Sequence, residues 1–353
     1  MPLRLAGQRR SFMLEPHAGG GHHEVGVGRR SRHPAGSRAV ARPVQTKAQA
    51  LARAQAAVVG VRATAVEDAR SNESLGRERE GSGVVIGTDG LVLTIGYLIL
   101  EADHVELVLG AERVIPARVV AYDLASGFAL LQGLVPVRVP PVRMGESSAI
   151  ALQQPLMIAS GGEDGESSLA RLVSRRAFSG YWEYHVDGAL FTAPPRTDHS
   201  GAGLFNADGE LLGIGSLVVM DALGPDHPRM PGNMFVPIDL LKSILPELRQ
   251  RGASRGSTRA WLGLNCVEVD GMVRVVRTSP DGPAEQAGLL PGDRILRIDG
   301  VEVNGLEGLY KTLWRGSSPE REVSLLIQRG GEQQNVKLQS QDRTKLLRRA
   351  KGI

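Results

Sequence analysis

The chain has 353 residues, including 44 glycines, 20 prolines and one cysteine. This length is sufficient for two domains with hydrophobic cores, and the glycine content favours many turns and short strands over long helices. The single cysteine, Cys266, excludes an intramolecular disulfide, and we expect it to be a small buried side chain at the end of a strand. No run of 18 apolar residues is present, so no transmembrane helix is predicted.

The positive charge lies at the start of the chain. The net charge is +4, but residues 1–50 hold nine Lys/Arg against two acids, which leaves the remaining chain at −3. Residues 1–45 have no hydrophobic periodicity and are predicted to be a disordered basic segment. The pair Arg9-Arg10 is similar to a twin-arginine export signal, but no apolar segment follows, so no signal peptide is recognised. Attachment to nucleic acid or an acidic membrane through this segment is an alternative that rests on composition alone, and no specific nucleic-acid binding is expected.

The first half of the chain predicts many short strands. Residues 46–65 predict an alanine-rich helix followed by a strand. Residues 81–94 predict a hairpin, because two apolar runs flank the turn Asp89-Gly90. Further strands are predicted at 105–109, 117–122, 129–131 and 155–159. Short strands at this spacing are typical of an antiparallel barrel.

A serine lies in a glycine-rich turn near the middle of the chain. Residues 197–204 read T-D-H-S-G-A-G-L, and an apolar strand, the turn Asp208-Gly209 and a second strand follow. Such a turn places the hydroxyl of Ser200 where backbone N–H groups can surround it. A serine-protease nucleophile is presented in this way.

Residues 251–258 are a polar, Gly/Ser-rich linker. Residues 279–300 read S-P-D-G-P-A-E-Q-A-G-L-L-P-G-D-R-I-L-R-I-D-G. Residues 341–353 form a basic tail, in which residues 343–351 are expected to be a frayed, solvated end.

These motifs resemble the HtrA (DegP/DegS-like) family, in which a trypsin-fold protease domain precedes a PDZ domain. Residues 81–94 resemble the family pattern G-S-G-V-I … D-G-x-I-L-T, residues 197–204 resemble G-N-S-G-G-P-L, and residues 279–300 resemble an HtrA-type PDZ domain. The resemblance implies a mainly β chain, with a trypsin-like double antiparallel β-barrel followed by a PDZ domain. It further implies a closing strand and helix of the protease domain at 234–245, and PDZ helices at 284–287 and 306–314 with a late strand at 322–328. It implies a basic N-terminal segment, a protease-fold domain, a linker, a PDZ domain and a basic C-terminal tail, at residues 1–45, 46–250, 251–258, 259–340 and 341–353.

The resemblance also implies where a catalytic triad belongs, and only its serine is kept. The family's histidine motif, L-T-N-x-H-V, corresponds to residues 93–98, which places Tyr97 at the histidine position. The aspartate motif, D-x-x-[ST]-D, corresponds to residues 123–127, which places Gly127 at the aspartate position. A phenol, whose pKa is ordinarily about 10, is a poor general base at neutral pH. Ser200 is therefore expected to be unactivated.

The residues around the serine do not compensate for these losses. The oxyanion hole is implied to use the backbone at positions 198 and 200, and Asp198 replaces the glycine of the family. A carboxylate ~4 Å from a developing oxyanion opposes it by about 4 kcal/mol at an effective dielectric constant of 20. His199 adjoins Ser200 and is expected to point to the opposite face, while His104 and His185 are expected to be ordinary surface or satisfied residues. No His/Asp/Glu cluster has metal-ligand spacing, so neither a metal nor another cofactor is predicted.

Two functions remain open for this chain. We favour an HtrA-like pseudoprotease that binds protein C-termini or unfolded segments through its PDZ domain. The alternative is an active HtrA-type serine endopeptidase of protein quality control that uses Ser200 with a non-standard base. The resemblance further implies a homotrimer and a periplasmic location, although the sequence by itself leaves the location unknown.

The PDZ groove is the part of the chain that we expect to bind a partner. A PDZ domain adds a peptide as an extra strand at a sheet edge and captures the terminal carboxylate with backbone N–H groups of a loop. In the family this loop reads [YW]-[LIF]-G-[VIL], and residues 261–264 match it. The expected partners are polypeptides with apolar C-termini or unfolded proteins. The expected peptide-binding residues are Trp261, Leu262, Gly263, Leu264, Leu309 and Leu313.

Overall fold

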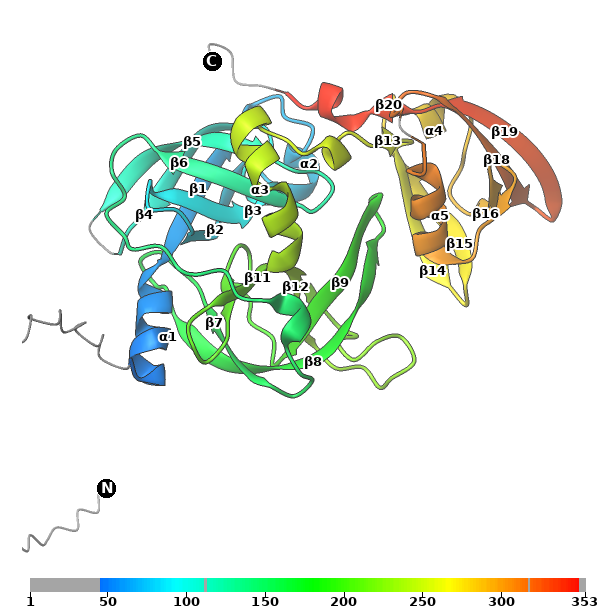
Figure 1. Ribbon diagram of the computed structural model, residues 1–353. Helices are drawn as coiled ribbons and strands as arrows, with labels where there is room; N and C mark the ends of the chain where they lie inside the picture. The colour runs from blue at the N-terminus through cyan, green and yellow to red at the C-terminus, as the bar shows by residue number, and fades with distance from the viewer. Residues whose placement is uncertain (1–44, 111–112, 317, 349–353) are drawn as a thin grey trace, which may run out of the picture. The chain divides into compact units, whose positions relative to one another are not determined.

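The computed structural model describes residues 45–110, 113–316 and 318–348. Within this part, two closed antiparallel barrels of six strands each are followed by a two-stranded sheet and a six-stranded sheet (Figure 1). The mainly β architecture predicted from the sequence is therefore confirmed. The predictions made for residues 1–44 lie outside the described residues.

The first barrel has the strand order β1-β2-β3-β6-β5-β4 and closes where β1 pairs with β4, with Val61 opposite Leu107. Helix α1 (Lys47–Ala56) precedes it and begins with a capping box, in which the Thr46 hydroxyl accepts the Gln49 N–H and the Gln49 side chain accepts the Thr46 N–H. The predicted helix and hairpin are both confirmed. The remaining elements are β1 (Val58–Ala65), α2 (Asn72–Leu75), β2 (Glu78–Val85), β3 (Leu91–Ile95), η1 (Gly96–Leu98), β4 (Ala102–Val108), β5 (Val114–Tyr122) and β6 (Phe128–Gly133).

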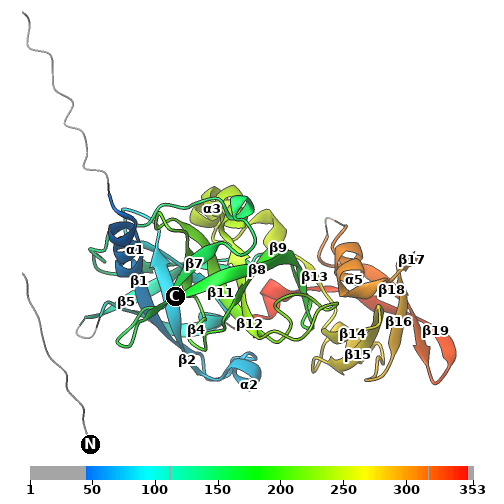
Figure 2. The ribbon, with the colours of Figure 1, turned by 90° about the horizontal axis from the view of Figure 1, so that it is seen from below.

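The second barrel has the strand order β10-β11-β12-β9-β8-β7. Its longest strands, β8 and β9, form a hairpin that the sequence analysis did not predict, shown in green in Figure 1 and Figure 2. Helix α3 (Ile238–Arg251) follows the barrel and ends at Gly252, which has the left-handed φ of 78° common at helix ends. The elements are η2 (Ser147–Ala149), β7 (Pro155–Ala159), β8 (Ser167–Gly180), β9 (Tyr184–Ala193), β10 (Gly203–Phe205), β11 (Leu211–Val219) and β12 (Gly232–Pro237).

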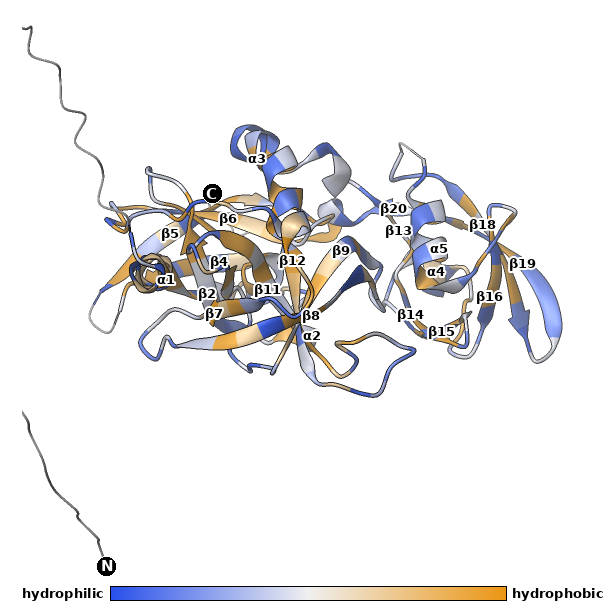
Figure 3. Cartoon of the chain, turned by 60° about the horizontal axis from the view of Figure 1, so that its bottom comes forward, coloured by the Kyte–Doolittle hydropathy of each residue, from blue (hydrophilic) through white to orange (hydrophobic). Residues whose placement is uncertain are grey.

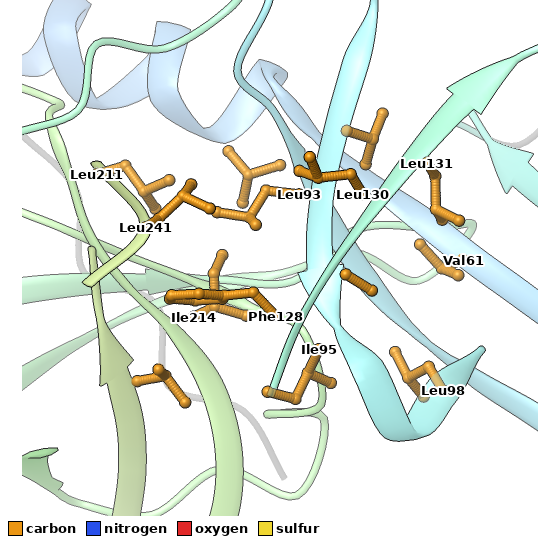
Figure 4. Packing of buried hydrophobic residues seen from close by; sticks show 14 of the residues in the cluster. Val61, Leu93, Ile95, Leu98, Phe128, Leu130, Leu131, Leu211, Ile214 and Leu241 are labelled. Atoms are coloured by element: carbon orange, nitrogen blue, oxygen red, sulfur yellow. The ribbon is translucent and has the colours of Figure 1, made fainter. Parts of the chain in front are cut away.

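One apolar cluster joins the two barrels. Figure 4 shows side chains of the first barrel, among them Leu93 and Phe128, close to Ile214 of the second barrel and Leu241 of α3. All four side chains are fully buried. The hydropathy of the residues agrees with this burial: Figure 3 shows hydrophobic residues on β6 and β12 of the barrels, whereas β19 is mainly hydrophilic. The interface between the barrels is therefore as well packed as a domain core.

The third part has its own core, which includes Cys266. This side chain is fully buried, as expected, but it lies inside β14 rather than at the end of a strand. Its main sheet has the order β14-β15-β16-β18-β19, with β17 paired to β16. The predicted linker, residues 251–258, begins at the last residue of α3 and contains η3 (Arg255–Ser257). The elements are β13 (Ala260–Trp261), β14 (Leu264–Val269), β15 (Met272–Thr278), α4 (Pro283–Gln286), β16 (Arg294–Ile298), β17 (Val301–Glu302), α5 (Gly305–Leu313), β18 (Glu322–Arg329) and β19 (Glu332–Gln339).

The prediction of a frayed end is wrong for residues 343–348. Strand β20 (Gln341–Asp342) pairs with β13, and η4 (Arg343–Leu346) follows it. The N–H of Arg348 then donates to the Glu101 carboxylate at 2.7 Å. Backbone pairing at one end and a charge-assisted hydrogen bond at the other fix a segment that looks merely basic in the sequence. Among the helices of the described residues, none has an apolar stretch of the length needed to cross a bilayer.

The glycine-rich turn that carries Ser200 is held between the barrels. The Ser200 carbonyl accepts the Ser82 N–H of β2 at 2.8 Å, and the Gly201 N–H donates to the Gly215 carbonyl of β11 at 2.9 Å. Gly201 has φ 74°, and a Cβ atom at this position would overlap the Ser82 carbonyl oxygen. Only glycine fits here, because the position requires both a left-handed backbone and close backbone approach.

The substitution Gly201→Ala is expected to lower the free energy of unfolding by about 2–4 kcal/mol, because it combines left-handed strain with overpacking. Gly188→Ala is the matched control, since Gly188 also has a positive φ, 64°, but has open space around the Cβ position. It is expected to cost about 1 kcal/mol. Chemical denaturation of both variants measures the difference, and equal losses would contradict the close approach.

Candidate functional site

Tyr97 and Ser200 are brought into direct contact. Tyr97 lies in η1, immediately after β3, and its Oη is 2.8 Å from Ser200 Oγ. The same Oη is 2.9 Å from the backbone carbonyl oxygen of Ser216 in β11. The phenol therefore connects the first barrel to two segments of the second.

The direction of these hydrogen bonds matters for the chemistry of Ser200. A carbonyl can only accept, and the phenol of Tyr97 has one proton to donate. When that proton goes to the Ser216 carbonyl, the Ser200 hydroxyl donates to Tyr97 Oη. Burial raises the pKa of Tyr97 to about 12, which the hydrogen bond with Ser200 only partly opposes. The phenolate fraction at pH 7 is then about 10⁻⁵, so Tyr97 is a neutral partner of Ser200.

A second phenol closes the space beside Gly127. Gly127 has φ 82°, and a Cβ atom there would lie 2.9 Å from Tyr184 Oη. The Tyr184 hydroxyl donates to the Ser126 carbonyl at 2.7 Å, which fixes the ring in place. Burial raises the pKa of Tyr184, so this group is also neutral. Among the described residues, no carboxylate forms a hydrogen bond with Tyr97.

Asp198, whose carboxylate was expected to oppose a developing oxyanion, forms an ion pair with an arginine. Arg196 Nε donates to Asp198 Oδ1 at 2.8 Å, and the Ser160 hydroxyl donates to the other carboxylate oxygen. Although burial disfavours the charged form, these hydrogen bonds hold the pKa of Asp198 below its usual range. Sequence reasoning missed Arg196, although residues two apart in an extended segment point to the same side. The expected repulsion of an oxyanion is reduced, because an arginine already balances the carboxylate.

Within the part of the chain that the structure describes, no histidine side chain forms a hydrogen bond with Ser200. The ring of His199 has Nδ1 3.0 Å from the Thr197 carbonyl oxygen, and burial lowers its pKa. No hydrogen bond joins this ring to Ser200. The side chain of His104 is exposed on β4, and His185 is buried between Ser179 and Asp187. Both were expected to be ordinary surface or satisfied residues, and both are.

One group of potential ligand atoms does form that the sequence spacing did not predict. His185, Asp187 and Glu307 have ligand atoms within 4.8 Å of one another. Lys311 Nζ donates to Asp187 at 3.0 Å and to Glu307 at 2.6 Å. One lysine ammonium forms ion pairs with both carboxylates, so we interpret the group as an ion-pair cluster.

A cavity of about 760 Å³ opens beside Tyr97. His199, Ser216 and Leu217 line it from the side of the glycine-rich turn and β11. Three aromatic side chains of the β8–β9 hairpin, namely Tyr181, Trp182 and Tyr184, line another side. Trp261 and Leu264 of the PDZ domain also line it, so this space next to Tyr97 lies between the second barrel and the PDZ domain.

The loop at residues 261–264 holds a carboxylate from within the chain. The N–H groups of Leu262 and Gly263 donate to the two carboxylate oxygens of Glu183, at 2.9 and 3.2 Å. Gly263 has φ 76°, and a Cβ there would lie 3.2 Å from the ring of Trp261. Sequence reasoning missed Glu183, because it lies at the tip of a hairpin whose strands were not predicted.

The remaining predicted groove residues lie in the core. Leu262, Leu264, Leu309 and Leu313 belong to one buried cluster, and none is more than 2% exposed. Two α5 side chains form polar contacts with the β8–β9 hairpin: the Tyr310 hydroxyl donates to the Gly180 carbonyl at 2.8 Å, and Lys311 donates to Asp187 of β9. The polar contacts of α5 therefore come from Tyr310 and Lys311, whereas the predicted Leu309 and Leu313 are buried in the core.

Comparison with known families gives two matches. The trypsin-like peptidase domain matches residues 81–214, and the PDZ domain matches residues 260–339. Among similar proteins, the "Probable periplasmic serine endoprotease DegP-like" of Halomonas elongata is 28% identical over 277 residues, covering 74% of this chain and 56% of that protein. The "Putative protease Do-like 14" of Arabidopsis thaliana is 27% identical over 259 residues, covering 63% of this chain and 57% of that protein. The chain thus spans little more than half the length of these relatives.

Solved structures with the same fold include the "HtrA-type protease AlgW with decapeptide", with a TM-score of 0.52 at 21% identity, covering 84% of this chain and 98% of that chain. The serine endoprotease from Yersinia pestis has a TM-score of 0.51 at 22% identity, covering 85% and 99%. The order of the two matched domains, the DegP-like relatives and the shared fold agree with the motifs at residues 81–94, 197–204 and 279–300. This chain belongs to the HtrA family, with a trypsin-like peptidase domain followed by a PDZ domain.

Proposed function

We propose that this chain is an HtrA-type pseudoprotease that binds protein C-termini or unfolded segments. The observation that carries the proposal is the hydrogen bond between Tyr97 Oη and Ser200 Oγ, which puts a neutral phenol where the family has a base. The loss of the nucleophile or its base in a subtilisin-type triad costs about 10⁶ in turnover. With Gly127 beside Tyr184 in place of an orienting carboxylate, neither partner of Ser200 is available.

The second candidate is an active serine endopeptidase that uses Ser200 with a non-standard base. The names of the relatives, which are serine endoproteases, favour it. His199 is the nearest histidine in sequence, but its Nδ1 is engaged by the Thr197 carbonyl. Activity would require this loop to rearrange before the ring could reach Ser200.

Purified protein is expected to degrade unfolded casein no faster than its Ser200→Ala variant, because the hydroxyl donates to a neutral phenol. Release of fluorescent fragments measures the rate, and an active HtrA protease serves as the positive control. Cleavage that disappears with Ser200→Ala would instead favour the endopeptidase.

The phenol of Tyr97 is expected to act in stability. Tyr97→Phe removes the donor to the buried Ser216 backbone and should lower the free energy of unfolding by about 1–2 kcal/mol. Tyr181→Phe is the matched control, because the Tyr181 side chain is 56% exposed, and its loss should be near zero. Thermal unfolding measures both, and equal losses would show that the Tyr97 hydrogen bonds contribute no net stability.

The PDZ domain supports the binding half of the proposal. Glycine at position 263 leaves the N–H groups of the loop free to approach a carboxylate, and Glu183 demonstrates that two of them converge on one. An apolar last residue is proposed because the core that adjoins the loop is apolar and includes Leu262, Leu264, Leu309 and Leu313. The names of the relatives suggest a periplasmic location, and the family resemblance suggests a homotrimer; both are proposed here for this chain.

The full-length protein is expected to bind fluorescent peptides ending in Val, Leu, Ile or Phe with a Kd of about 1–100 μM. C-terminal amidation should weaken binding at least about tenfold, because the charge-assisted hydrogen bonds are lost. Fluorescence anisotropy with paired free-acid and amidated peptides measures the ratio. Equal affinity for both forms would argue against carboxylate capture.

A further inference from the structure

The tip of the β8–β9 hairpin lies against the PDZ loop at residues 261–264 and against strand β14. Residues 181–183 join the two strands. The Glu183 carboxylate accepts the N–H groups of Leu262 and Gly263, and the Tyr181 carbonyl accepts the Cys266 N–H of β14 at 2.9 Å. The carboxylate thus binds at the loop, and a residue two positions earlier pairs with the neighbouring strand. A peptide that adds a strand to a PDZ domain uses the same two kinds of contact.

Helix α5 supplies the opposite wall. The Tyr310 hydroxyl donates to the Gly180 carbonyl at 2.8 Å and accepts the Glu183 N–H at 3.3 Å. The Tyr310 side chain is 1% exposed and stacks on Trp314. The tip is therefore held on three sides, by the loop, by β14 and by α5.

The burial and the backbone conformation of Glu183 are both energetically unfavourable. Its side chain is buried, and its φ of 57° lies in the left-handed region, which side chains other than Gly and Asn rarely adopt. Burial raises the pKa of its carboxyl to about 7, although the loop N–H groups and the positive charge of Arg343 act in the opposite direction. Strained backbone conformations of this kind cluster at ligand clamps and switch regions.

We propose that the tip of the β8–β9 hairpin is an internal ligand of the PDZ groove, in which the Glu183 carboxylate stands in for the terminal carboxylate of a peptide. An external C-terminus then binds only when it displaces this tip. The inference rests on the proposed peptide-binding function of the same groove. It adds a competitor within the chain and predicts that the measured affinity reflects the fraction of molecules in which the groove is free.

The test uses the full-length protein and two glutamate substitutions. Glu183→Gln keeps the shape of the side chain but removes the charge that two N–H groups bind. Glu166→Gln is the matched control, because Glu166 is an exposed carboxylate just before β8. A fluorescent free-acid peptide ending in Val should bind Glu183→Gln about tenfold more tightly than wild type, if the groove is free about a tenth of the time. The affinity of Glu166→Gln should equal that of wild type.

A second measurement needs no peptide and separates the two claims. The amides of Leu262, Gly263 and Cys266 should exchange hydrogen slowly in wild type and at least about tenfold faster in Glu183→Gln. Faster exchange without any peptide binding would support the internal ligand and contradict the proposed function. Peptide binding with unchanged affinity and unchanged exchange in the variant would overturn the internal ligand and leave the proposed function intact.

A variant on the other side of the contact guards against misfolding of Glu183→Gln. Tyr310→Phe removes the hydroxyl that donates to the Gly180 carbonyl and keeps the ring that stacks on Trp314. It should raise peptide affinity several-fold and speed exchange at Cys266. Unchanged values for both quantities would also overturn the proposal.

Discussion

The shared apolar core between the two barrels is the constraint on which the site depends. Phe128 and Leu93 of the first barrel and Ile214 of the second are fully buried in one cluster. Because both barrels contribute to it, η1 on one side and the glycine-rich turn on the other cannot move apart independently. This packing holds Tyr97 and Ser200 close enough to form their hydrogen bond.

The three positions that differ from the family pattern each have a specific local partner. Tyr97 is bonded to the Ser216 carbonyl, Gly127 lies against the Tyr184 hydroxyl, and Asp198 is paired with Arg196. A buried polar group without a partner costs about 1–3 kcal/mol, and none of these groups lacks one. The site is therefore a repacked polar interface, in which several side chains depend on one another.

The sequence predicted the strands and turns whose signals are local. The turn at Asp89-Gly90 and the strand that follows it were predicted correctly, because Asp-Gly between two apolar runs is a strong local signal for a hairpin turn. Strand β8 was missed because it contains the pair Arg175-Arg176, of which Arg175 is exposed and Arg176 is half-buried. Their guanidinium groups donate to backbone carbonyl groups such as those of Ser147 and Asp221, which the sequence does not reveal. The positions of Tyr97, Gly127 and Ser200 came from family motifs, whereas Tyr184 and Glu183 came from tertiary contacts alone. Arg196 is a local partner of Asp198 that the sequence could have indicated. No short-range rule places a glutamate from residue 183 against a loop at residue 262.

The segment after β19 connects the PDZ domain to the first barrel a second time. Before the domain, Ser254 Oγ donates to Asp123 and the Leu124 N–H donates to Ser257 Oγ, so the linker is bound to the first barrel. After the domain, Arg348 returns to Glu101 of the same barrel. A domain tethered at both ends explores less volume than one on a single flexible linker. The effective concentration of the PDZ surface next to the barrels therefore stays high. Contacts that would be weak between separate molecules can persist under this restriction, and shortening the chain before residue 348 would remove one of the two tethers.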